Sequence, residues 1–480
     1  MLGKTQVRQE NLFFPPRQQA TGKHNLLRQI NKNIDFTAFR EKAAPYFSDT
    51  GRPSIDPVAM LKMMVLGYLF DIRSDRMIVE EVIDRDSFRE FVGYGCDENI
   101  PTHANFTRWR QRIGPEVFKD FLLDVLSQCK AAGMRLGNCR LFDSTRVQAR
   151  ASTSSSAKVE LELSEQPNEY LDAFGWQTEE DDPEDDPRHG RKLVVNTNDP
   201  EARLIRHGNE PSRFVHKVHM GVDSKTGLIT NVMASHKPDH QAMIEFLRRE
   251  EGIDCIGADK GYSATECFRE LEAMGIKAFI SVLDHSNDKG DKYHLSDFTY
   301  RMEDDTFICP AGKTLRMVCA QPAKKRRMYA ANQSDCAQCP LRDRCTSGKR
   351  RTLTVSADRP LIEKVKFYAR LPRYARVMSR RKAVMEGTFA HAKVWCGMSR
   401  ARGIGREAMD IQATLVAAVI NVKKLLAHLG KGSFSSLKLV FVLPRRLSEV
   451  TQGLMWSLQS PTRSELVKVQ RYIYRPVAAD

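Results

Sequence analysis

The feature that most constrains this fold is a change in hydrophobic period near Gly137. From about Ile34 to Gly133, apolar residues recur at helical spacing, as in the runs VAMLKMMVLGYLF and VFKDFLLDVLSQC. After Gly137 they gather instead in short, β-branched runs bounded by turn residues. The sequence therefore predicts an all-α N-terminal domain over residues 1–135, followed by a domain built on a sheet.

The second domain is predicted to be α/β, a mixed sheet with helices on both faces. Five runs predict strands: CRLFDST, FVHKVHMGVD, LITNVMAS, DCIGAD and KAFISVL. Helical segments near Gln241–Arg249 and Thr265–Met274 separate the later runs, and strands that first follow one another and then alternate with helices favour this layout. The core is expected over residues 136–283, completed by a helical segment over 353–430.

Two segments interrupt this domain and a tail follows it. Residues 160–187 hold twelve Asp and Glu and no Lys or Arg, which predicts a flexible acidic loop. Residues 284–352 form a polar insertion that carries cysteines. The tail over residues 431–480 has one apolar run, LKLVFVL, and no other informative pattern.

The charge balance points to a polyanionic partner. The chain has 75 Lys and Arg against 60 Asp and Glu, a net charge of +15, and basic side chains near phosphates release condensed counterions. Basic membrane-surface proteins share this bias, but the N-terminus has no apolar signal region and the apolar stretches are too short to span a bilayer. We therefore expect a soluble, cytoplasmic, nucleoid-associated protein whose 11 cysteines are metal ligands or buried thiols.

Three acidic residues are candidates for a phosphoryl-transfer site. Asp143 and Asp259 each follow an apolar, strand-like run, and Glu386 lies in a segment of helical period. Lys382 and Lys393 fall on the same helical face as the glutamate. Carboxylates that converge at a sheet edge suit two divalent cations about 3.5–4 Å apart, and Mg²⁺ prefers such oxygen ligands. A single Asp at a strand end is more often a turn residue or a helix cap, so the residues alone leave both interpretations open.

Three segments resemble the signature regions of bacterial insertion-sequence DDE transposases: DSTRVQARAS from Asp143, ADKGYSATECFRELEAMGIKAFI from Ala258 and MEGTFAHAKVWCGMSRARGIG from Met385. The chain is most similar to the IS-five / IS-eleven-eighty-two type of these transposases. That type has a helical N-terminal transposase region, which the resemblance implies binds the DNA ends, and a cysteine-bearing insertion. GRPSIDPVAMLKMMVLGYL, PTHANFTRWRQRIG, NTNDPEARLIRHG and FVHKVHMGVDSKTGLI are similar to further segments of that type. The resemblance covers roughly residues 36–429, in order.

The resemblance implies a ribonuclease H-like catalytic core that binds two Mg²⁺ ions, for which Mn²⁺ could substitute. Asp143, Asp259 and Glu386 match the catalytic and metal-binding triad of the family, and Lys393 matches its basic residue seven positions after the glutamate.

The sequence also departs from some relatives before the glutamate. They carry a tyrosine and an arginine at set distances, where this chain has Ser379 and Lys382, with Arg380 and Arg381 alongside. The departure puts the strand-handling roles of these positions in doubt, while the acidic triad is intact.

The implied reaction is transposition by two-metal phosphoryl transfer. Double-stranded DNA is cleaved at the inverted repeats of the element, and the freed 3′-hydroxyl ends are joined to target DNA. Because two ends are joined in one event, we expect a homodimer or a larger synaptic assembly. Two alternatives fit the same residues: a ribonuclease H-like nuclease without strand transfer, and a catalytically inactive DNA-binding descendant.

The insertion carries a candidate zinc site. Cys309, Cys336, Cys339 and Cys345 have the spacing C-x26-C-x2-C-x5-C, and a CxxC pair is a usual half-site for Zn²⁺. The x5 spacing is loose, and Cys319 is an alternative fourth ligand. Structural zinc and unliganded thiols therefore both remain open.

Candidate DNA contacts lie in three places. In the segment that starts near Thr102, the arginines belong either to a helix-turn-helix-like unit or to an amphipathic helix packed by Trp109. Basic residues of the insertion are solvated loop residues unless they border a DNA site, and two more lie before the glutamate. The candidates are Arg108, Arg110, Arg112, Lys324, Lys325, Arg326, Arg381 and Lys382.

Other chemistry-bearing residues receive no functional role. The histidines among the predicted strands and turns are typical of packing or surface positions, namely His216, His219, His236 and His240. Trp395, Cys396 and the aliphatic stripe after Met409 are predicted to be core.

Overall fold

The computed structural model describes residues 26–48, 50, 54–95, 98–160, 192–206, 211–282, 292–322 and 325–430. The rest of the predicted acidic loop after residue 160, the run LKLVFVL and Lys324 lie outside these residues. By compactness the chain divides into Met1–Leu425 and Leu426–Asp480. Within the described residues, no helix combines the length and apolarity needed to cross a membrane.

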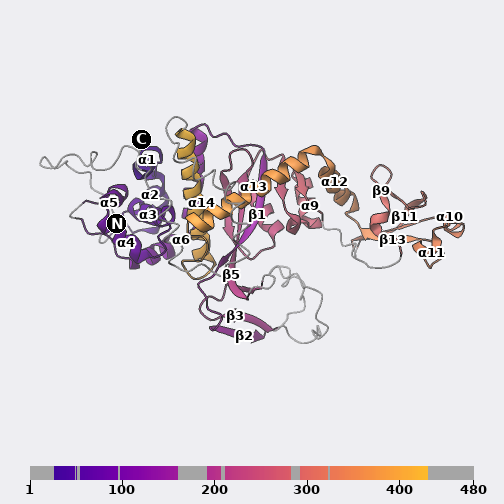
Figure 1. The fold of residues 1–480 in the computed structure, drawn as a ribbon, viewed down its shortest axis with the longest axis horizontal. Helices are drawn as coiled ribbons and strands as arrows, with labels where there is room; N and C mark the ends of the chain where they lie inside the picture. Colours follow the sequence, from indigo (N-terminus) through magenta and orange to yellow (C-terminus); the bar gives the residue numbers. More distant parts are fainter. Residues whose placement is uncertain are drawn as a thin grey trace, which may run out of the picture. The chain divides into compact units, whose positions relative to one another are not determined.

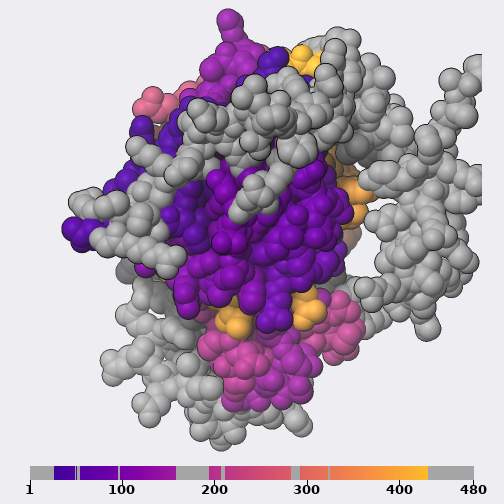
Figure 2. Space-filling model, turned by 90° about the vertical axis from the view of Figure 1, so that its left-hand side faces the viewer, coloured from indigo at the N-terminus to yellow at the C-terminus, as the bar shows by residue number. Residues whose placement is uncertain are grey.

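The N-terminal part is helical, as the period predicts (Figure 1). Its elements are α1 (Leu26–Asn33), α2 (Thr37–Ala43), η2 (Ala44–Tyr46), α3 (Pro57–Leu69), α4 (Asp75–Asp84), α5 (Asp86–Val92) and α6 (Ala104–Ala131). Helix α3 begins where the Asp56 carboxylate accepts a hydrogen bond from the Val58 N–H, with Pro57 at the first helical position. Because α3 is buried on nearly every side, it forms the centre of this region. Figure 2 shows the surface of these helices in indigo and purple.

Helix α6 joins two segments that the sequence predicts separately. The helix starts at Ala104 and runs to Ala131, but Gly114 has φ 73° and ψ 174°, which no helical residue adopts. Pro115 follows at once and lacks the N–H that would continue the ladder. The bend therefore lies at the Gly-Pro pair, where the sequence predicts a break.

A six-stranded mixed sheet follows, and it confirms the five predicted strands. Its strands are β1 (Cys139–Gln148), β4 (Arg203–Ile205), β5 (Arg213–Asp223), β6 (Ile229–Ala234), β7 (Cys255–Ala258) and β8 (Lys277–Ile280). The order is β4-β5-β1-β7-β8, and β6 also pairs with β5. Strand β5 is antiparallel to β1, β4 and β6, whereas β1, β7 and β8 are parallel to one another.

Helices cover both faces of this sheet. On one face, Phe142 shares a core with residues of α8 (Asp239–Leu247) and α9 (Thr265–Ala273). On the other face, Val377 of α13 (Pro372–Trp395) packs on Leu141 and Gly257. A Cβ at Gly257 would lie 2.7 Å from Val377, so the glycine permits the close approach of α13. The helical segment predicted over residues 353–430 contains α13 together with α12 (Arg359–Arg370) and α14 (Arg406–Leu429).

The insertion folds as a second, smaller sheet, which the sequence does not predict. Strands β9 (Thr299–Arg301), β10 (Thr306–Ile308), β11 (Thr314–Gln321), β12 (Arg326–Ala330) and β13 (Thr352–Ser356) are antiparallel neighbours in the order β13-β12-β11-β10-β9. Three short helices accompany them: η4 (Leu295–Asp297), α10 (Gln333–Ala337) and α11 (Arg342–Cys345). A further unpredicted antiparallel pair is formed by β2 (Ser156–Glu160) and β3 (Lys192–Asn196). All of these strands except β11 have only three to five residues, so each is too short to stand out by its hydrophobic period.

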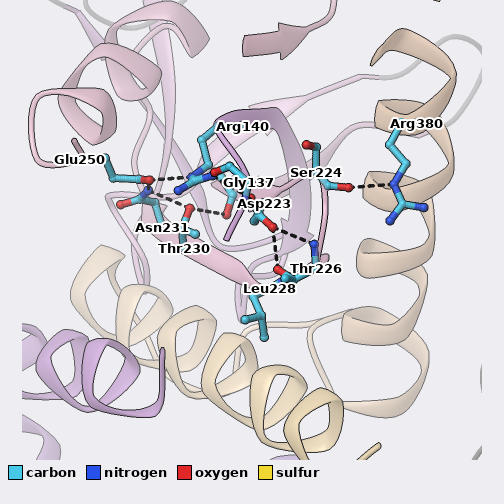
Figure 3. Close-up of polar contacts among 11 residues, drawn as sticks. Gly137, Arg140, Asp223, Ser224, Thr226, Leu228, Thr230, Asn231, Glu250 and Arg380 are labelled. Atoms are coloured by element: carbon cyan, nitrogen blue, oxygen red, sulfur yellow. Dashed lines mark hydrogen bonds and ion pairs between the residues drawn. The ribbon is translucent and has the colours of Figure 1, made fainter. Parts of the chain in front are cut away.

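A buried polar network fixes the start of β1 (Figure 3). The Arg140 guanidinium donates to Asp223 Oδ1 at 2.8 Å, to Glu250 Oε2 at 2.6 Å and to the Gly137 carbonyl at 2.9 Å. Asp223 also accepts from the backbone N–H and the hydroxyl of Thr226, both at 2.7 Å. The network holds the register of β1 against β5 at this end of the sheet.

Two packing predictions have opposite outcomes. Cys396 and the stripe of α14 after Met409 are buried, as predicted. Trp395 was predicted to be core, and this is wrong, because 53% of its surface is exposed. It stands at the last position of α13, beside Val394, which is 60% exposed.

Candidate functional site

Strands β1 and β7 bring Asp143 and Asp259 together. The two strands pair in parallel with Leu141 opposite Gly257, so the residues two positions further on are also neighbours. Successive side chains alternate between faces, which directs both carboxylates to the face that α13 covers. The adjacency of these two acids thus follows from the strand register.

The environment of Asp143 keeps a negative charge incompletely compensated. Its side chain is half-buried, and Arg381 of α13 donates to its Oδ2 at 2.8 Å. Burial raises the pKa of Asp143, the charge of Arg381 lowers it, and the nearby negative charge of Asp259 raises it again, with a net upward shift. Two carboxylates that repel each other beside one arginine form a place where an added cation would be favoured.

Asp259 is oriented by its own backbone. Its Oδ1 accepts the Gly261 N–H at 2.9 Å, which caps η3 (Lys260–Tyr262). Tyr262 then turns inward and is only 2% exposed. Burial, together with the charges of Asp239, Asp143 and Asp259, raises the pKa of Tyr262 well above its ordinary value, so the phenol stays protonated beside the acids.

A third carboxylate, Asp239, lies near this cluster and was not predicted. Its Oδ2 accepts from Lys217 Nζ at 2.8 Å, and His219 Nδ1 lies 3.1 Å from its Oδ1. Burial would raise its pKa, but the hydrogen bond from His219 and the charge of Lys217 lower it. Asp239 precedes the helix predicted near Gln241–Arg249 and begins α8 in the structure, and an Asp before a helix is too common to single out a residue.

Glu386 is on the same helix as Arg381, five residues further along. Its side chain is exposed. Within the part of the chain that the structure describes, no three His, Cys, Asp or Glu side chains are arranged to hold a metal ion. Lys382 is exposed, whereas Lys393 is half-buried and burial lowers its pKa. The metal-binding role of Glu386 therefore stays a prediction.

The arginines of α6 differ in their surroundings. Arg110 forms a two-pronged ion pair with Asp75, with N–O distances of 2.8 and 2.9 Å. Arg108 and Arg112 are exposed. Trp109 is 6% exposed, so it packs as the amphipathic-helix alternative requires. Of the three predicted DNA contacts, Arg110 has its guanidinium committed within the protein.

Four cysteines of the insertion converge. Cys309, Cys336, Cys339 and Cys345 line one small cavity, and Cys319 does not. Burial raises the pKa of Cys345, the charge of Arg351 lowers it, and the other three thiols raise it. In the same insertion, Lys325 and Arg326 are exposed.

The unassigned histidines are largely buried. His216 Nε2 lies 2.9 Å from the buried carboxylate of Asp199, and His219 contacts the backbone carbonyl of Ser235 at 3.0 Å. Burial lowers the pKa of His236 to about 4. These contacts agree with packing roles.

Two family models match the chain. The model described as a transposase domain, DUF772, matches residues 15–112, and the model described as a transposase DDE domain matches residues 308–426. Glu386 and Lys393 fall inside the second match, whereas Asp143 and Asp259 fall outside both. No curated protein matches the chain in sequence.

One solved structure with some similarity is the cryo-EM structure of the piggyBac transposase synaptic complex with hairpin DNA. It is 12% identical with a TM-score of 0.34, over 95% of this chain and 84% of that one. A likeness at this level does not establish a shared fold. By its family matches, the chain carries a transposase domain over residues 15–112 and a transposase DDE domain over residues 308–426.

Proposed function

We propose that this chain is the DNA transposase of an insertion sequence, of the IS-five / IS-eleven-eighty-two type. It would cleave DNA at the inverted repeats of its element and join the 3′-hydroxyl ends to target DNA. The observation that carries the proposal is the match of the DDE domain over the helix of Glu386, together with a sheet in which Asp143 and Asp259 are neighbours. The order of that sheet, antiparallel around β5 and parallel from β1 to β8, supports a ribonuclease H-like core.

The acids fit the divalent metals that DDE domains use. Asp143 and Asp259 offer hard oxygen ligands side by side, and their mutual repulsion would be relieved by Mg²⁺. Bound there, a pair of Mg²⁺ ions would activate the attacking oxygen and stabilise the leaving oxygen of an in-line displacement. Arg381 supplies the only positive side chain hydrogen-bonded to Asp143 among the described residues, and it would give up this place to the cation.

Glu386 is proposed as the third carboxylate. It follows Arg381 by five helical residues, which corresponds to about 7.5 Å along the axis. Because Arg381 contacts Asp143, this helix is anchored beside the acids. Glu386 is exposed and stands about 140° round the helix from Arg381, so α13 would have to turn or shift to bring the glutamate to the acids. The glutamate would complete the site when the cation and DNA are present.

A basic stretch next to the acids is proposed to hold the DNA backbone. Residues 359–406 contain thirteen Lys and Arg but only two Glu, so they supply most of the net charge of the chain. Arg376, Arg380 and Lys382 of α13 are exposed. Lys393 would contact a phosphate near the acids, and Lys325 and Arg326 would extend the contact along the insertion.

The reaction proceeds by two displacements at phosphorus with no protein–DNA bond. Water is the first nucleophile and the freed 3′-hydroxyl is the second, so the protein needs to position strands and stabilise charge rather than supply a nucleophile. Asp143 lies within β1 and Asp259 directly follows β7, so the sheet would fix the positions of their carboxylate oxygens. A homodimer or larger assembly would bring two DNA ends together.

The decisive assay supplies the full-length protein with Mg²⁺ and pre-cleaved oligonucleotides that end in the inverted repeat flanking the gene. Strand transfer is expected, and Asp143→Asn, Asp259→Asn or Glu386→Gln should each lower it by about 10³-fold or more. Glu251→Gln, a change at an exposed acid, is the matched control. Cleavage without joining would instead identify the nuclease alternative, and DNA binding with neither activity would identify the inactive descendant.

Recognition of the DNA ends is tested separately on α6. Arg108→Ala and Arg112→Ala should each weaken binding to the terminal repeat in a gel shift and reduce the salt slope by about 1 per lost phosphate contact. Unchanged affinity and slope in both variants would remove α6 from the interface. Arg110→Ala should act through lost stability, because its ion pair with Asp75 disappears.

We also propose a structural Zn²⁺ on the four cavity-lining cysteines. All four line one cavity, and the other three raise the pKa of Cys345, which supports a shared thiolate site. In the described residues no three of them are arranged to hold a metal, so zinc binding would draw the four sulfurs together. Protein purified without chelator should contain one zinc per chain, and Cys339→Ser should lose it. Absence of zinc from the wild-type protein would contradict this proposal and leave the transposase proposal intact.

A further inference from the structure

Two cysteines face each other beneath α13. Cys139 and Cys255 are directly paired in the parallel register of β1 and β7, and they are 5% and 0% exposed. Neighbouring strands lie about 4.8 Å apart, which is within the span of about 4.4–6.8 Å that a disulfide bridges between Cα atoms. Both are free thiols, and they pack under Val377 and Tyr374 of α13.

An arginine contacts this pair from α13. Arg373 Nη2 lies 3.3 Å from Cys255 Sγ, and the two thiols hydrogen-bond each other. The hydrogen bond from Cys139 and the charge of Arg373 lower the pKa of Cys255 although burial opposes this. The same hydrogen bond, with burial, raises the pKa of Cys139, so the first proton leaves Cys255 and the second stays on its neighbour.

Other buried cysteines lack this combination. Burial raises the pKa of Cys129 to about 11 and that of Cys267 to about 12, as expected for inert structural thiols. Cys255 differs because a cation and a second thiol contact the same sulfur. A thiol with a lowered pKa next to a second cysteine shares two features of oxidation-sensitive sites. Both sulfurs are buried, so peroxide would reach them through local opening of the cover that α13 provides.

We propose that Cys139 and Cys255 form a redox-sensitive pair that hydrogen peroxide converts to a disulfide, with Arg373 holding the reacting sulfur of Cys255. The Cys255 sulfur attacks one peroxide oxygen, the O–O bond breaks, and a sulfenic acid and one water form. The Cys139 sulfur then attacks that sulfenic sulfur, the S–O bond breaks, and the hydroxyl leaves as a second water with the thiol proton. Two thiols lose two electrons and two protons, and the peroxide is reduced to two waters.

The pair is close to the candidate site. Asp143 and Asp259 each lie four residues further along the same two strands. A disulfide would tie β1 to β7 just before these acids and would change the sulfur that Arg373 contacts from α13. Oxidation would therefore act on the base of the site, but the pairing of the thiols does not depend on what the site does.

The test uses the full-length protein, freed of reductant and treated with hydrogen peroxide. After alkylation of remaining thiols, digestion and mass spectrometry should detect a peptide that joins Cys139 to Cys255, reversed by dithiothreitol and absent from Cys255→Ser. Cys267→Ser, at a buried thiol elsewhere, should leave the linkage intact. If peroxide oxidises the insertion cysteines while Cys139 and Cys255 remain alkylatable, the proposal is wrong.

A second variant tests the arginine without altering either thiol. Arg373→Met should slow formation of the linkage roughly threefold, because a rise of one unit in thiol pKa lowers the thiolate fraction more than it raises nucleophilicity. Arg376→Met removes the same charge from an exposed position of α13 and should leave the rate unchanged. Equal rates in both variants would contradict the role of Arg373.

Discussion

The buried part of β1 has a charged residue near each end, Arg140 and Asp143, and the two differ in how completely their charges are paired. At the first end, Arg140 is 3% exposed and is bonded to two carboxylates and a carbonyl, with Asp223 fully satisfied around it (Figure 3). At the other end, three residues on, Asp143 has one arginine and a second carboxylate, Asp259, as neighbours. The same strand thus carries a closed network and an open one.

The first arrangement stabilises the fold, whereas the second favours binding of a cation. A buried charge network in which every group is hydrogen-bonded holds strands in register and leaves no unpaired charge to bind a ligand. A cluster in which like charges face each other is unfavourable alone and becomes favourable with a cation. Binding and catalytic sites are expected where a cluster of unpaired like charges is held in place by a neighbouring network of paired charges.

Breaking the closed end should have the largest effect. Arg140→Met leaves Asp223 and Glu250 without their shared cation in a buried position, so the free energy of unfolding should fall by about 3–5 kcal/mol. Urea unfolding followed by circular dichroism measures this, with Arg146→Met on the exposed part of β1 as control. A loss as small as that of the control would mean that the network does not stabilise the strand.

The open end should respond to metal instead. Mg²⁺ at 100 times its dissociation constant should stabilise the wild-type protein by about 2.7 kcal/mol. The gain should disappear in Asp143→Asn and persist in Glu251→Gln. Thermal unfolding with and without Mg²⁺ measures both, and equal stabilisation of all three proteins would place the cation elsewhere.

Sequence reasoning found these two acids because each directly follows an apolar run, which is a local signal. The runs CRLF and DCIGA are apolar and end at an Asp, so two parallel strands bring the acids together. Glu386 was predicted from a helical period, but the direction of its side chain depends on how α13 packs, which the period does not specify. Tyr262 and Asp239 were missed because their proximity comes from the turn after β7 and the start of α8.

The hydrogen bond that ties α13 to the loop after β5 should contribute less to stability than the Arg140 network. Arg380 of α13 donates to the Ser224 carbonyl at 2.9 Å, beside the closed network, from an exposed position (Figure 3). Arg380→Met should lower the free energy of unfolding by about 0.5–1.5 kcal/mol, the contribution of one such hydrogen bond. Loss comparable to that of Arg140→Met in the same urea titration would show that α13 belongs to the network itself.

The smallest effect should come from Asp143 without metal, and it should depend on pH. Because the folded protein raises the pKa of Asp143 above 3.8, its contribution to stability is fully present below pH 3.8 and is lost as pH rises through the folded pKa. Asp143→Asn should therefore be slightly more stable than wild type at pH 7 in EDTA and equal to it below pH 3.8. Lower stability of the variant at pH 7 would mean that Arg381 overcompensates the charge.

The limits of prediction elsewhere are also physical. The helices and the large sheet followed from periodicity, whereas β11, with the sequence TLRMVCAQ, is mostly exposed and shows no apolar alternation. Trp395 was misjudged because an aromatic residue in a helical pattern is usually buried, but α13 ends at this residue. Arg110 was predicted to contact DNA because the sequence does not reveal its ion pair with Asp75, which lies 35 residues away.

The most direct test of the central claim is a crystal structure of the protein with Mn²⁺ and end DNA, measured for anomalous scattering. We predict an anomalous peak about 2 Å from carboxylate oxygens of Asp143 and Asp259, close to the distance of Mg²⁺ to its ligands, with Glu386 brought to the same metal site and Arg381 released. A structure in which DNA is bound but Mn²⁺ avoids these acids, or in which Glu386 remains turned away from an occupied site, would contradict the account.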